Sequence, residues 1–390
     1  MKQLVFLTLL LLFLGCQSQT KDSYVYNPPP ELADDLQTGT LTEVGLDSVP
    51  IIKAVNKIGA GRFGEIHSLL LYKEGKLVLE EYFPGHIYQW DGPRHHGKLV
   101  NWDRDMSHSI MSDTKSITSV CIGVAVDKGF IADVDQSIFD YLPEHQHLAR
   151  DGKEHLTIEH LLTMTPGLEW EEWNAPYSSL ENPIIGIWYS EMDPVSHILS
   201  GNLVRAPGSG FAYYGGSQIL LGEILKNATG MPIDEFSQQY LWEPLNIENA
   251  NWSVRFENGV IESAGGLKLK PRDMLKVGIT YLDEGVWNGE QIVSSAWVAK
   301  SRIPYKSNTG IKVPGETSRK QGYSYSWWIN PLEHQGEQIE AYHAGGWGGQ
   351  KIIVIPPLKT VIVFTGGNYT GRVPQFRIVE KYLLPAIDEH

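Results

Sequence analysis

The sequence predicts an α+β fold, in which an antiparallel sheet flanked by helices is built from both ends of the chain and a mainly helical domain is inserted between them. Apolar runs of strand length lie near both ends of the chain, within residues 68–82 and 323–365. Between them, residues 157–163, 217–225 and 273–281 repeat apolar side chains at helical spacing. This distribution predicts a sheet that is completed only when the two ends meet.

The first half of the sheet begins with a predicted hairpin, because two apolar runs at 68–72 and 77–82 flank a glycine-containing turn. A long helix is predicted after Ser112, since apolar residues recur there at intervals of three and four. Lys128 and Gly129 give this helix a basic last turn and a C-cap. The recurring apolar residues are Ile117, Val120, Cys121, Val124 and Ala125.

The second half of the sheet is predicted near the C-terminus. Residues 323–329 and 338–343 are strand-like, and two more strands are expected at 351–355 and 360–365. A last helix is predicted to begin near Pro374. The chain is therefore divided into a leader at 1–16, a spacer at 17–55, a first α/β part at 56–130, a mainly helical insert at 131–310 and a second α/β part at 311–390.

The composition argues against some classes of partner. The 390 residues carry a formal net charge of -14 and no run of Lys or Arg, so no nucleic-acid partner is expected. The thirteen histidines form no HExxH pattern, and we expect neither a metal nor a cofactor. His145-Gln146-His147 is assigned to a solvated loop. No feature indicates an oligomeric state.

The N-terminus has the pattern of an export signal. Lys2 precedes an apolar run at 4–14 that is too short to span a bilayer comfortably. The run ends in Gly15-Cys16, which resembles a bacterial lipobox with Cys16 as the lipidated residue. We therefore expect an exported lipoprotein, anchored to a membrane and facing the periplasm or the cell surface. The alternative is an ordinary secretory signal with an incidental cysteine.

The chemistry of the chain is predicted around Ser112-Asp113-Thr114-Lys115. Ser112 and Lys115 are three residues apart on one helix, so their side chains can meet. If Lys115 is buried, its pKa falls and the neutral amine can accept the proton of Ser112. The pattern alone is not decisive, because it also occurs at Ser18 and Lys21 within the spacer. Ser112 can equally be an N-cap, and Lys115 a solvated lysine of the first turn.

Two glycine-rich segments strengthen the catalytic interpretation. Residues 207–216 present Tyr213 and Tyr214 in a turn before a helix, and residues 343–350 place several glycines at the end of a strand. In this order and setting, the sequence resembles the serine β-lactamase and penicillin-binding-protein superfamily, particularly its class C-like, family VIII-type esterase branch. The resemblance covers most of the chain after residue 60.

The resemblance implies a β-lactamase/transpeptidase-like fold and a set of catalytic roles. Ser112 would form an acyl-enzyme, Lys115 would help to deprotonate it, and Tyr213 would be the general acid and base. Tyr213 can act as a base only if Lys115 lowers the pKa of its phenol. The backbone N–H groups of Ser112 and Gly346 would form the oxyanion hole, and His343 with Gly345 would contact substrate.

Two departures from the family pattern concern the substrate. Gly215 stands where class C β-lactamases carry Asn, and His343 replaces the Lys of the Lys-Thr-Gly motif. Both changes remove features suited to β-lactams. We therefore expect a hydrolase of small esters or amides. The alternatives are a D-amino-acid peptidase or weak β-lactamase, and a non-catalytic module that binds cell wall or glycan.

Overall fold

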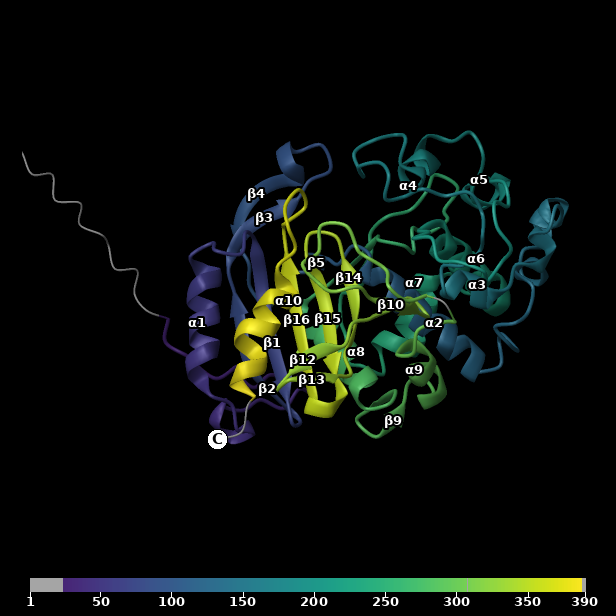
Figure 1. Cartoon of the computed structure of the whole chain (residues 1–390). Helices are drawn as coiled ribbons and strands as arrows, with labels where there is room; N and C mark the ends of the chain where they lie inside the picture. Colours follow the sequence, from purple (N-terminus) through teal and green to yellow (C-terminus); the bar gives the residue numbers. More distant parts are fainter. Residues whose placement is uncertain (1–23, 307, 388–390) are drawn as a thin grey trace, which may run out of the picture.

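The computed structural model describes residues 24–306 and 308–387, and its centre is a seven-stranded antiparallel sheet. The strand order is β10-β11-β14-β15-β16-β1-β2, so strands from both ends of the chain lie side by side (Figure 1). The predicted fold class is confirmed. The strands are β1 (Ile66–Lys73), β2 (Lys76–Tyr82), β10 (Gly322–Ser324), β11 (Trp327–Ile329), β14 (Tyr342–Gly346), β15 (Gln350–Ile355) and β16 (Thr360–Gly366).

The two chain ends join where β1 pairs with β16, with Leu70 opposite Val363. Side chains alternate between the two faces of this sheet, because successive residues of a strand point in opposite directions. Leu70 and Val363 enter a core shared with the helical part, whereas Leu69 and Phe364 enter a separate core on the other face. Both faces of the sheet are therefore covered.

One face carries α1 (Ser48–Gly59) and the C-terminal helix, which runs through α10 (Gln375–Ile378) and Val379–Leu383. The opposite face carries α2 (Asp113–Asp127) and α8 (Pro271–Leu282). The remaining helices are α3 (Ile158–Leu162), α4 (Pro183–Gly186), α5 (Pro194–Ser200), α6 (Gly216–Thr229), α7 (Ile233–Ser237) and α9 (Ser295–Ser301). Figure 1 shows α3 to α6 grouped to one side of the sheet.

Short strands complete the fold. The hairpin of β3 (Pro84–Tyr88) and β4 (His96–Asn101) extends from the N-terminal part of the sheet. A three-stranded sheet joins the segment before Ser112 to the helical part. The other short strands are β5 (His108–Ser109), β6 (Asn251–Trp252), β7 (Leu267–Leu269), β8 (Val286–Trp287), β9 (Glu290–Gln291), β12 (Leu332–His334) and β13 (Glu337–Ile339).

The predicted spacer at 17–55 is wrong for its described part. Helix α1 begins at Ser48 and buries Ile51, Ala54 and Val55 against the sheet. Further upstream, Asp34 accepts a hydrogen bond of 2.8 Å from the buried guanidinium of Arg272 on α8. This segment lacks a helical pattern in the sequence, yet Leu36, Leu41 and Leu46 are buried because the folded domain supplies an apolar surface for them. Cys16, Ser18 and Lys21 lie outside the described residues.

Two other boundaries differ from the prediction. Helix α8 was assigned to the helical insert, but it packs on β15 and β16 and so belongs to the α/β part. The strand expected at 323–329 is divided into β10 and β11, because Tyr325 and Ser326 form a turn with φ of 44° and 65°. Both differences follow from tertiary contacts that helical and strand periodicity do not report.

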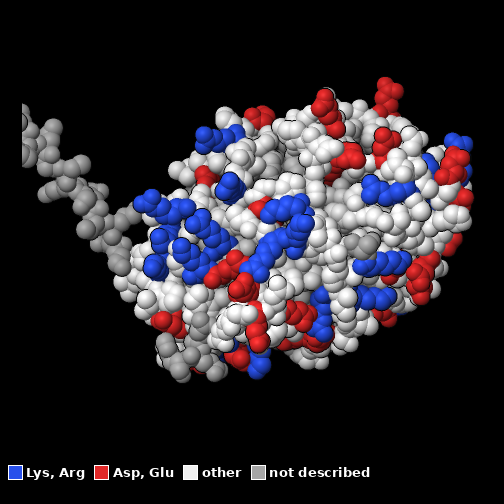
Figure 2. All heavy atoms as spheres, viewed as in Figure 1, with Lys and Arg blue, Asp and Glu red and all other residues white. Residues whose placement is uncertain are grey.

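The surface charge is unevenly distributed. Figure 2 shows Lys and Arg side chains gathered over α1 and the C-terminal helix, with acidic side chains among them, although the net charge is -14. The fully or partly exposed basic residues of these two elements are Lys53, Lys57, Arg377 and Lys381. In the part of the chain that the structure describes, no helix is long and apolar enough to cross a bilayer.

Candidate active site

Ser112 lies at the start of α2, and its hydroxyl faces the amine of Lys115. Ser112 occupies the N-cap position, but its side chain makes no capping hydrogen bond. Lys115 Nζ is instead 2.9 Å from Ser112 Oγ and 2.8 Å from the carbonyl oxygen of Ala264. Only 4% of Lys115 is exposed, so it is not a solvated first-turn lysine. The structure contradicts the two non-catalytic interpretations of this motif.

The environment of Lys115 favours the neutral amine. Burial lowers the pKa of Lys115, because the charged ammonium loses its water shell. Glu172 and Glu262 oppose this change through their negative charge, but the pKa remains below that of an ordinary lysine. Lys115 therefore lies at the correct distance, and with the correct direction of pKa shift, to accept a proton from Ser112.

Tyr213 comes from the loop before α6 and completes this group. Its ring centroid is 5.1 Å from Lys115 Nζ, and its phenol interacts with the side chain of Ser112. Trp173 stacks on Tyr213 with ring centroids 5.1 Å apart. The neighbouring Tyr214 is fully buried and stacks on Trp170 at 4.3 Å, away from Ser112. Of the two tyrosines, Tyr213 is the one in the site.

The predicted effect of Lys115 on Tyr213 is wrong. Burial, followed by the negative charge of Glu172, raises the pKa of Tyr213 well above the ordinary value of a phenol. The hydrogen bond with Ser112 lowers it only in part. Tyr213 is therefore a protonated phenol in this structure, suited to donate a proton rather than to act as a standing base.

Gly346 brings strand β14 directly against the segment that precedes the nucleophile. A Cβ atom at Gly346 would lie 2.3 Å from the carbonyl oxygen of Ile110, so only glycine permits this approach. Gly345, Gly346 and Ser112 line the same cleft. The predicted oxyanion donors, the N–H groups of Ser112 and Gly346, thus belong to adjoining segments at one site, and their role stays a prediction.

The cleft has a volume of about 440 Å³ and is rich in aromatic side chains. Trp173, Tyr177 and Trp347 line the cleft together with Trp328, a position that the sequence alone did not assign to them. A single aromatic residue in a sequence does not indicate whether it faces solvent, core or ligand. The helical part supplies Trp173 and Tyr177, strand β11 supplies Trp328, and the segment after β14 supplies Trp347.

His343 does not line the cleft, contrary to the prediction that it contacts substrate. Its side chain is 1% exposed, packs against Phe376 at 4.8 Å and has no hydrogen-bond partner among the described residues. Burial, followed by the positive charge of Lys351, lowers its pKa well below the ordinary value, so the ring is neutral. We therefore retain Gly345, but not the ring of His343, as a cleft residue.

Lys351 on β15 places a lysine side chain beside Gly345 of the cleft. It is the register partner of Gly345, and its Nζ would lie 2.8 Å from a Cβ atom at that glycine. Lys351 is buried and forms an ion pair with Glu316, a residue of the cleft lining. The amine is thus already paired, and among the described lining residues there is no Lys or Arg.

Sequence reasoning missed Glu172, a carboxylate of the cleft lining. Glu172 accepts hydrogen bonds from Trp170 at 2.9 Å, from Tyr177 at 2.9 Å and from the backbone of Gly215 at 2.7 Å. A Cβ atom at Gly215 would lie 2.9 Å from Glu172 Oε2. The carboxylate therefore occupies the space that a longer residue at 215 would need, which explains this departure from the family pattern.

Asp113 is a second polar group that the sequence did not single out. It follows the nucleophile directly, is fully buried, and neither carboxylate oxygen has a hydrogen-bond partner among the described residues. Burial raises its pKa to about 8, although the positive charges of Lys351 and Lys115 lower it in part. Asp113 is therefore mostly protonated at neutral pH.

Residues able to hold a metal ion lie outside this cleft. In the described part of the chain, Glu65, His86 and His96 group their ligand atoms within 4.8 Å of one another, and none of them lines the cleft. Nearby, His108 is buried and hydrogen-bonded to His67 at 2.8 Å. His145 pairs with Asp193 at 3.2 Å rather than with His147.

Comparison with known proteins identifies the family of the chain. Residues 67–375 match the β-lactamase family over most of the chain. The 6-aminohexanoate-dimer hydrolase of Paenarthrobacter ureafaciens is 27% identical over 267 residues, which cover 66% of this chain and 66% of that protein. The alignment thus spans just under two thirds of that relative.

Two further relatives represent other activities. The D-alanyl-D-alanine-carboxypeptidase/endopeptidase AmpH of Escherichia coli strain K12 is 22% identical over 281 residues, covering 67% of this chain and 71% of that protein. A solved family VIII carboxylesterase has a TM-score of 0.62 at 17% identity, covering 87% of this chain and 98% of that one. At this identity the carboxylesterase structure demonstrates the shared fold.

Proposed function

This chain belongs to the β-lactamase family and is a hydrolase, and we propose that it is an exported serine hydrolase that cleaves ester or amide bonds through an acyl-enzyme on Ser112. The observation that carries the proposal is the 2.9 Å separation of Ser112 Oγ and the buried Lys115 Nζ beside Tyr213. The names of the relatives agree with acyl transfer to water as the general reaction.

In the proposed acylation step, neutral Lys115 accepts the proton of Ser112 while Oγ attacks the carbonyl carbon of the substrate. The carbonyl oxygen becomes an oxyanion held by the N–H groups of Ser112 and Gly346. As the bond to the leaving group breaks, Tyr213 donates its proton to the departing oxygen or nitrogen. The Lys115 ammonium then returns a proton to Tyr213, which leaves both groups as they began.

Deacylation reverses these transfers with water in place of the leaving group. Water attacks the acyl carbonyl, and its proton passes through Tyr213 to Lys115 as the second oxyanion forms. Collapse of that intermediate breaks the bond to Ser112 Oγ, which takes the proton back. This cycle requires neutral Lys115 at its start, so kcat/KM is expected to rise with pH as Lys115 loses its proton.

A fluorophosphonate label tests the nucleophile. We expect one adduct per chain, mapped by mass spectrometry to Ser112 and absent in Ser112→Ala. Ser18→Ala is the matched control, because Ser18 and Lys21 repeat the same spacing. An adduct that persists in Ser112→Ala, or no adduct on an active wild type, would overturn the proposal and would favour the non-catalytic binding module.

The proposed substrates are neutral or cationic esters and amides. Glu172 and Glu316 line the cleft, and the buried amine of Lys351 is already paired with Glu316. A substrate carboxylate, as in β-lactams and D-Ala-D-Ala peptides, would lose water without gaining a free cation. A screen of p-nitrophenyl esters, D-aminoacyl amides and a chromogenic cephalosporin tests this. Efficient cephalosporin or D-Ala-D-Ala cleavage would favour the alternative of a β-lactamase or D-amino-acid peptidase.

Export and lipid anchoring form the second part of the proposal. They are supported by the basic start, the short apolar run and Gly15-Cys16 in the sequence. In a bacterial host, wild type is expected in the membrane fraction and Cys16→Ser in the soluble exported fraction. Equal partitioning of the two would leave the hydrolase proposal intact but would remove the anchor.

A further inference from the structure

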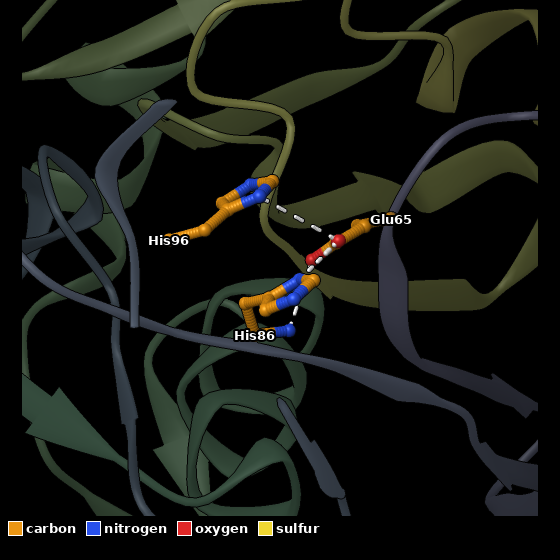
Figure 3. Close-up of side chains that lie close together, drawn as sticks. All are labelled: Glu65, His86 and His96. Atoms are coloured by element: carbon orange, nitrogen blue, oxygen red, sulfur yellow. Dashed lines mark hydrogen bonds and ion pairs between the residues drawn. The ribbon is translucent and has the colours of Figure 1, made fainter. Parts of the chain in front are cut away.

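A cluster of histidines and one carboxylate lies where β1 begins beside the β3–β4 hairpin. Glu65 immediately precedes β1, His86 lies on β3 and His96 lies on β4, and Figure 3 shows the two imidazoles turned toward the carboxylate. Glu65 Oε1 is 2.5 Å from His86 Nδ1 and 3.8 Å from His96 Nδ1. The two rings are parallel, with centroids 4.6 Å apart.

The hydrogen bond of His96 on the side away from Glu65 determines which of its ring nitrogens carries the proton. His96 Nε2 is 2.8 Å from the carbonyl oxygen of Gly367, which can only accept a hydrogen bond, so Nε2 carries the proton. In the neutral ring, Nδ1 then holds a lone pair. That lone pair and the carboxylate oxygen of Glu65 face each other across 3.8 Å, and either a proton on Nδ1 or a metal cation between them makes this contact attractive.

A second histidine, the buried His67, also directs a ring nitrogen at Glu65. His108 Nδ1 is 2.9 Å from the carbonyl oxygen of Ser109, so it is the donor there, and its Nε2 must accept from His67 Nδ1 at 2.8 Å. In neutral His67 the remaining lone pair, on Nε2, points at Glu65 Oε2 from 3.2 Å. The side chain of His67 is fully buried. Two histidine lone pairs thus converge on one carboxylate.

From this arrangement we infer that Glu65, His86 and His96 form a binding site for a divalent cation of the zinc type. In a tetrahedral zinc site, nitrogen and oxygen ligands lie about 2.0–2.2 Å from the ion and hence about 3.3–3.6 Å from one another. The separations of 2.5 and 3.8 Å lie on either side of that range, and the two parallel imidazole rings must rotate for both Nδ1 lone pairs to point at one ion. Zinc takes the place of the proton between His86 Nδ1 and Glu65, and this proton moves to His86 Nε2 or to solvent, so that the ring ligates as a neutral imidazole.

The surroundings of the cluster suit a metal site. Glu65 Oε2 accepts a hydrogen bond of 2.9 Å from the backbone of His86, and the Gly367 carbonyl orients His96, which leaves Oε1 and two imidazole nitrogens for the ion. Between 20% and 32% of each ligand side chain is exposed, which allows entry of the ion and a water as the fourth ligand. Two imidazoles and one carboxylate favour zinc over calcium or magnesium, which prefer oxygen ligands.

The position of the cluster gives the ion a structural effect on the active-site rim. The hairpin that carries His86 and His96 also packs Tyr88 and His95 against Trp347, with ring centroids 6.1 and 4.8 Å apart. Trp347 follows Gly346 and lines the cleft. A bound ion would tie this hairpin to β1 and so hold the support of Trp347 in place. The ion is a positioning element and takes no part in the bond-breaking steps.

The test is zinc binding by the tag-free, chelator-treated full chain, measured by calorimetry and by metal content after dialysis. We expect one Zn²⁺ per chain, a higher Tm with Zn²⁺, and no effect of Mg²⁺ or Ca²⁺. His96→Gln keeps a donor for the Gly367 carbonyl but removes the imidazole, and should weaken zinc binding about 10²-fold or more, since even outer-sphere changes cost 10–100-fold. His86→Asn should do the same.

His155→Ala is the matched control, because His155 is exposed and pairs only weakly with Glu154 at 3.8 Å. It should bind zinc as the wild type does. Unchanged zinc content in both cluster variants, equal loss in His155→Ala, or no zinc retained by the wild type would each overturn the site. The Tm of both cluster variants in chelator is measured first. If one of them does not fold without metal, the other is used. Ser112→Ala should bind zinc normally, which separates this site from the hydrolase proposal.

Discussion

The active-site cleft and the cluster of Glu65, His86 and His96 are two polar centres of one fold, and they are built in opposite ways. In the cleft, Lys115 is 4% exposed, a neutral amine is favoured, and aromatic rings line the space beside Ser112. In the cluster, each ligand side chain keeps at least 20% of its exposure and hydrogen bonds fix the histidine orientations. The cleft is arranged to move protons, whereas the cluster is arranged to hold a positive charge.

Burial and hydrogen-bond partners, rather than residue type, decide what a titratable group can do. Lys115 and Lys351 are both buried lysines, but only Lys351 has a carboxylate partner, Glu316. His67 and His343 are both buried histidines, but only His67 of the two has a polar partner at each ring nitrogen. A lysine thus serves either as a base or as one half of an ion pair. A histidine serves either as an orienting group or as a ring packed in the core.

Removal of the nucleophile should separate the two centres most strongly. Ser112→Ala is expected to lower kcat/KM for a p-nitrophenyl ester by about 10⁴-fold or more, because no other group can form the acyl-enzyme. Steady-state hydrolysis and zinc uptake measured on the same preparation check this. Residual activity within tenfold of wild type would mean that the cleft is not the hydrolytic centre.

Replacement of the Tyr213 phenol tests its role as the proton donor in the cleft. Tyr213→Phe keeps the stacking on Trp173 but removes the proton donor, and should lower kcat by about 10²–10⁴-fold. The loss should be greatest for esters with poor leaving groups, which need protonation as the bond breaks. A series of aryl esters with different leaving-group pKa values measures this. Equal losses across the series would contradict the donor role.

A change in the charge of the substrate is expected to have a smaller effect on the rate. Because Glu172 and Glu316 line it without a free Lys or Arg among the described lining residues, a carboxylate on the acyl chain should reduce kcat/KM by about tenfold or more relative to a neutral isostere. Glu172→Gln should narrow the difference if it folds. A preference for the anionic ester would show that Lys351 leaves Glu316 to bind substrate.

Asp113 gives the smallest expected effect, on stability. Its pKa is raised from 3.8 to about 8, so the folded state holds this proton more tightly and stability falls as pH rises from about 4 to about 8. Asp113→Asn resembles the protonated acid and should be more stable than wild type at pH 8 by at least about 1 kcal/mol, since one unit of pKa is worth 1.36 kcal/mol. The gain should vanish near pH 4.

Thermal unfolding of both proteins at several pH values measures this difference. A constant gap between the two Tm values across the range would mean that Asp113 does not titrate there. A lower Tm for Asp113→Asn at pH 8 would mean that the ionised carboxylate is the stabilising form.

The sequence was sufficient for features that depend on short-range spacing. The hairpin of β1 and β2 follows from two apolar runs around a glycine-containing turn. The helix after Ser112 and the contact between Ser112 and Lys115 follow from the spacing of three and four residues in a helix. The family resemblance added Tyr213 and Gly346, because their glycine-rich segments are recognisable in order along the chain. These residues do lie at one cleft.

Tertiary structure alone decided the features that join distant segments. Strand register put Lys351 opposite Gly345 while His343 turned into the core, and loop packing brought Glu172 against Gly215. The hairpin β3–β4 brought His86 and His96 to Glu65, although no metal-binding motif links them in the sequence. Periodicity within one helix or strand fixes only near neighbours, whereas contacts between elements depend on how the whole chain buries its apolar surface.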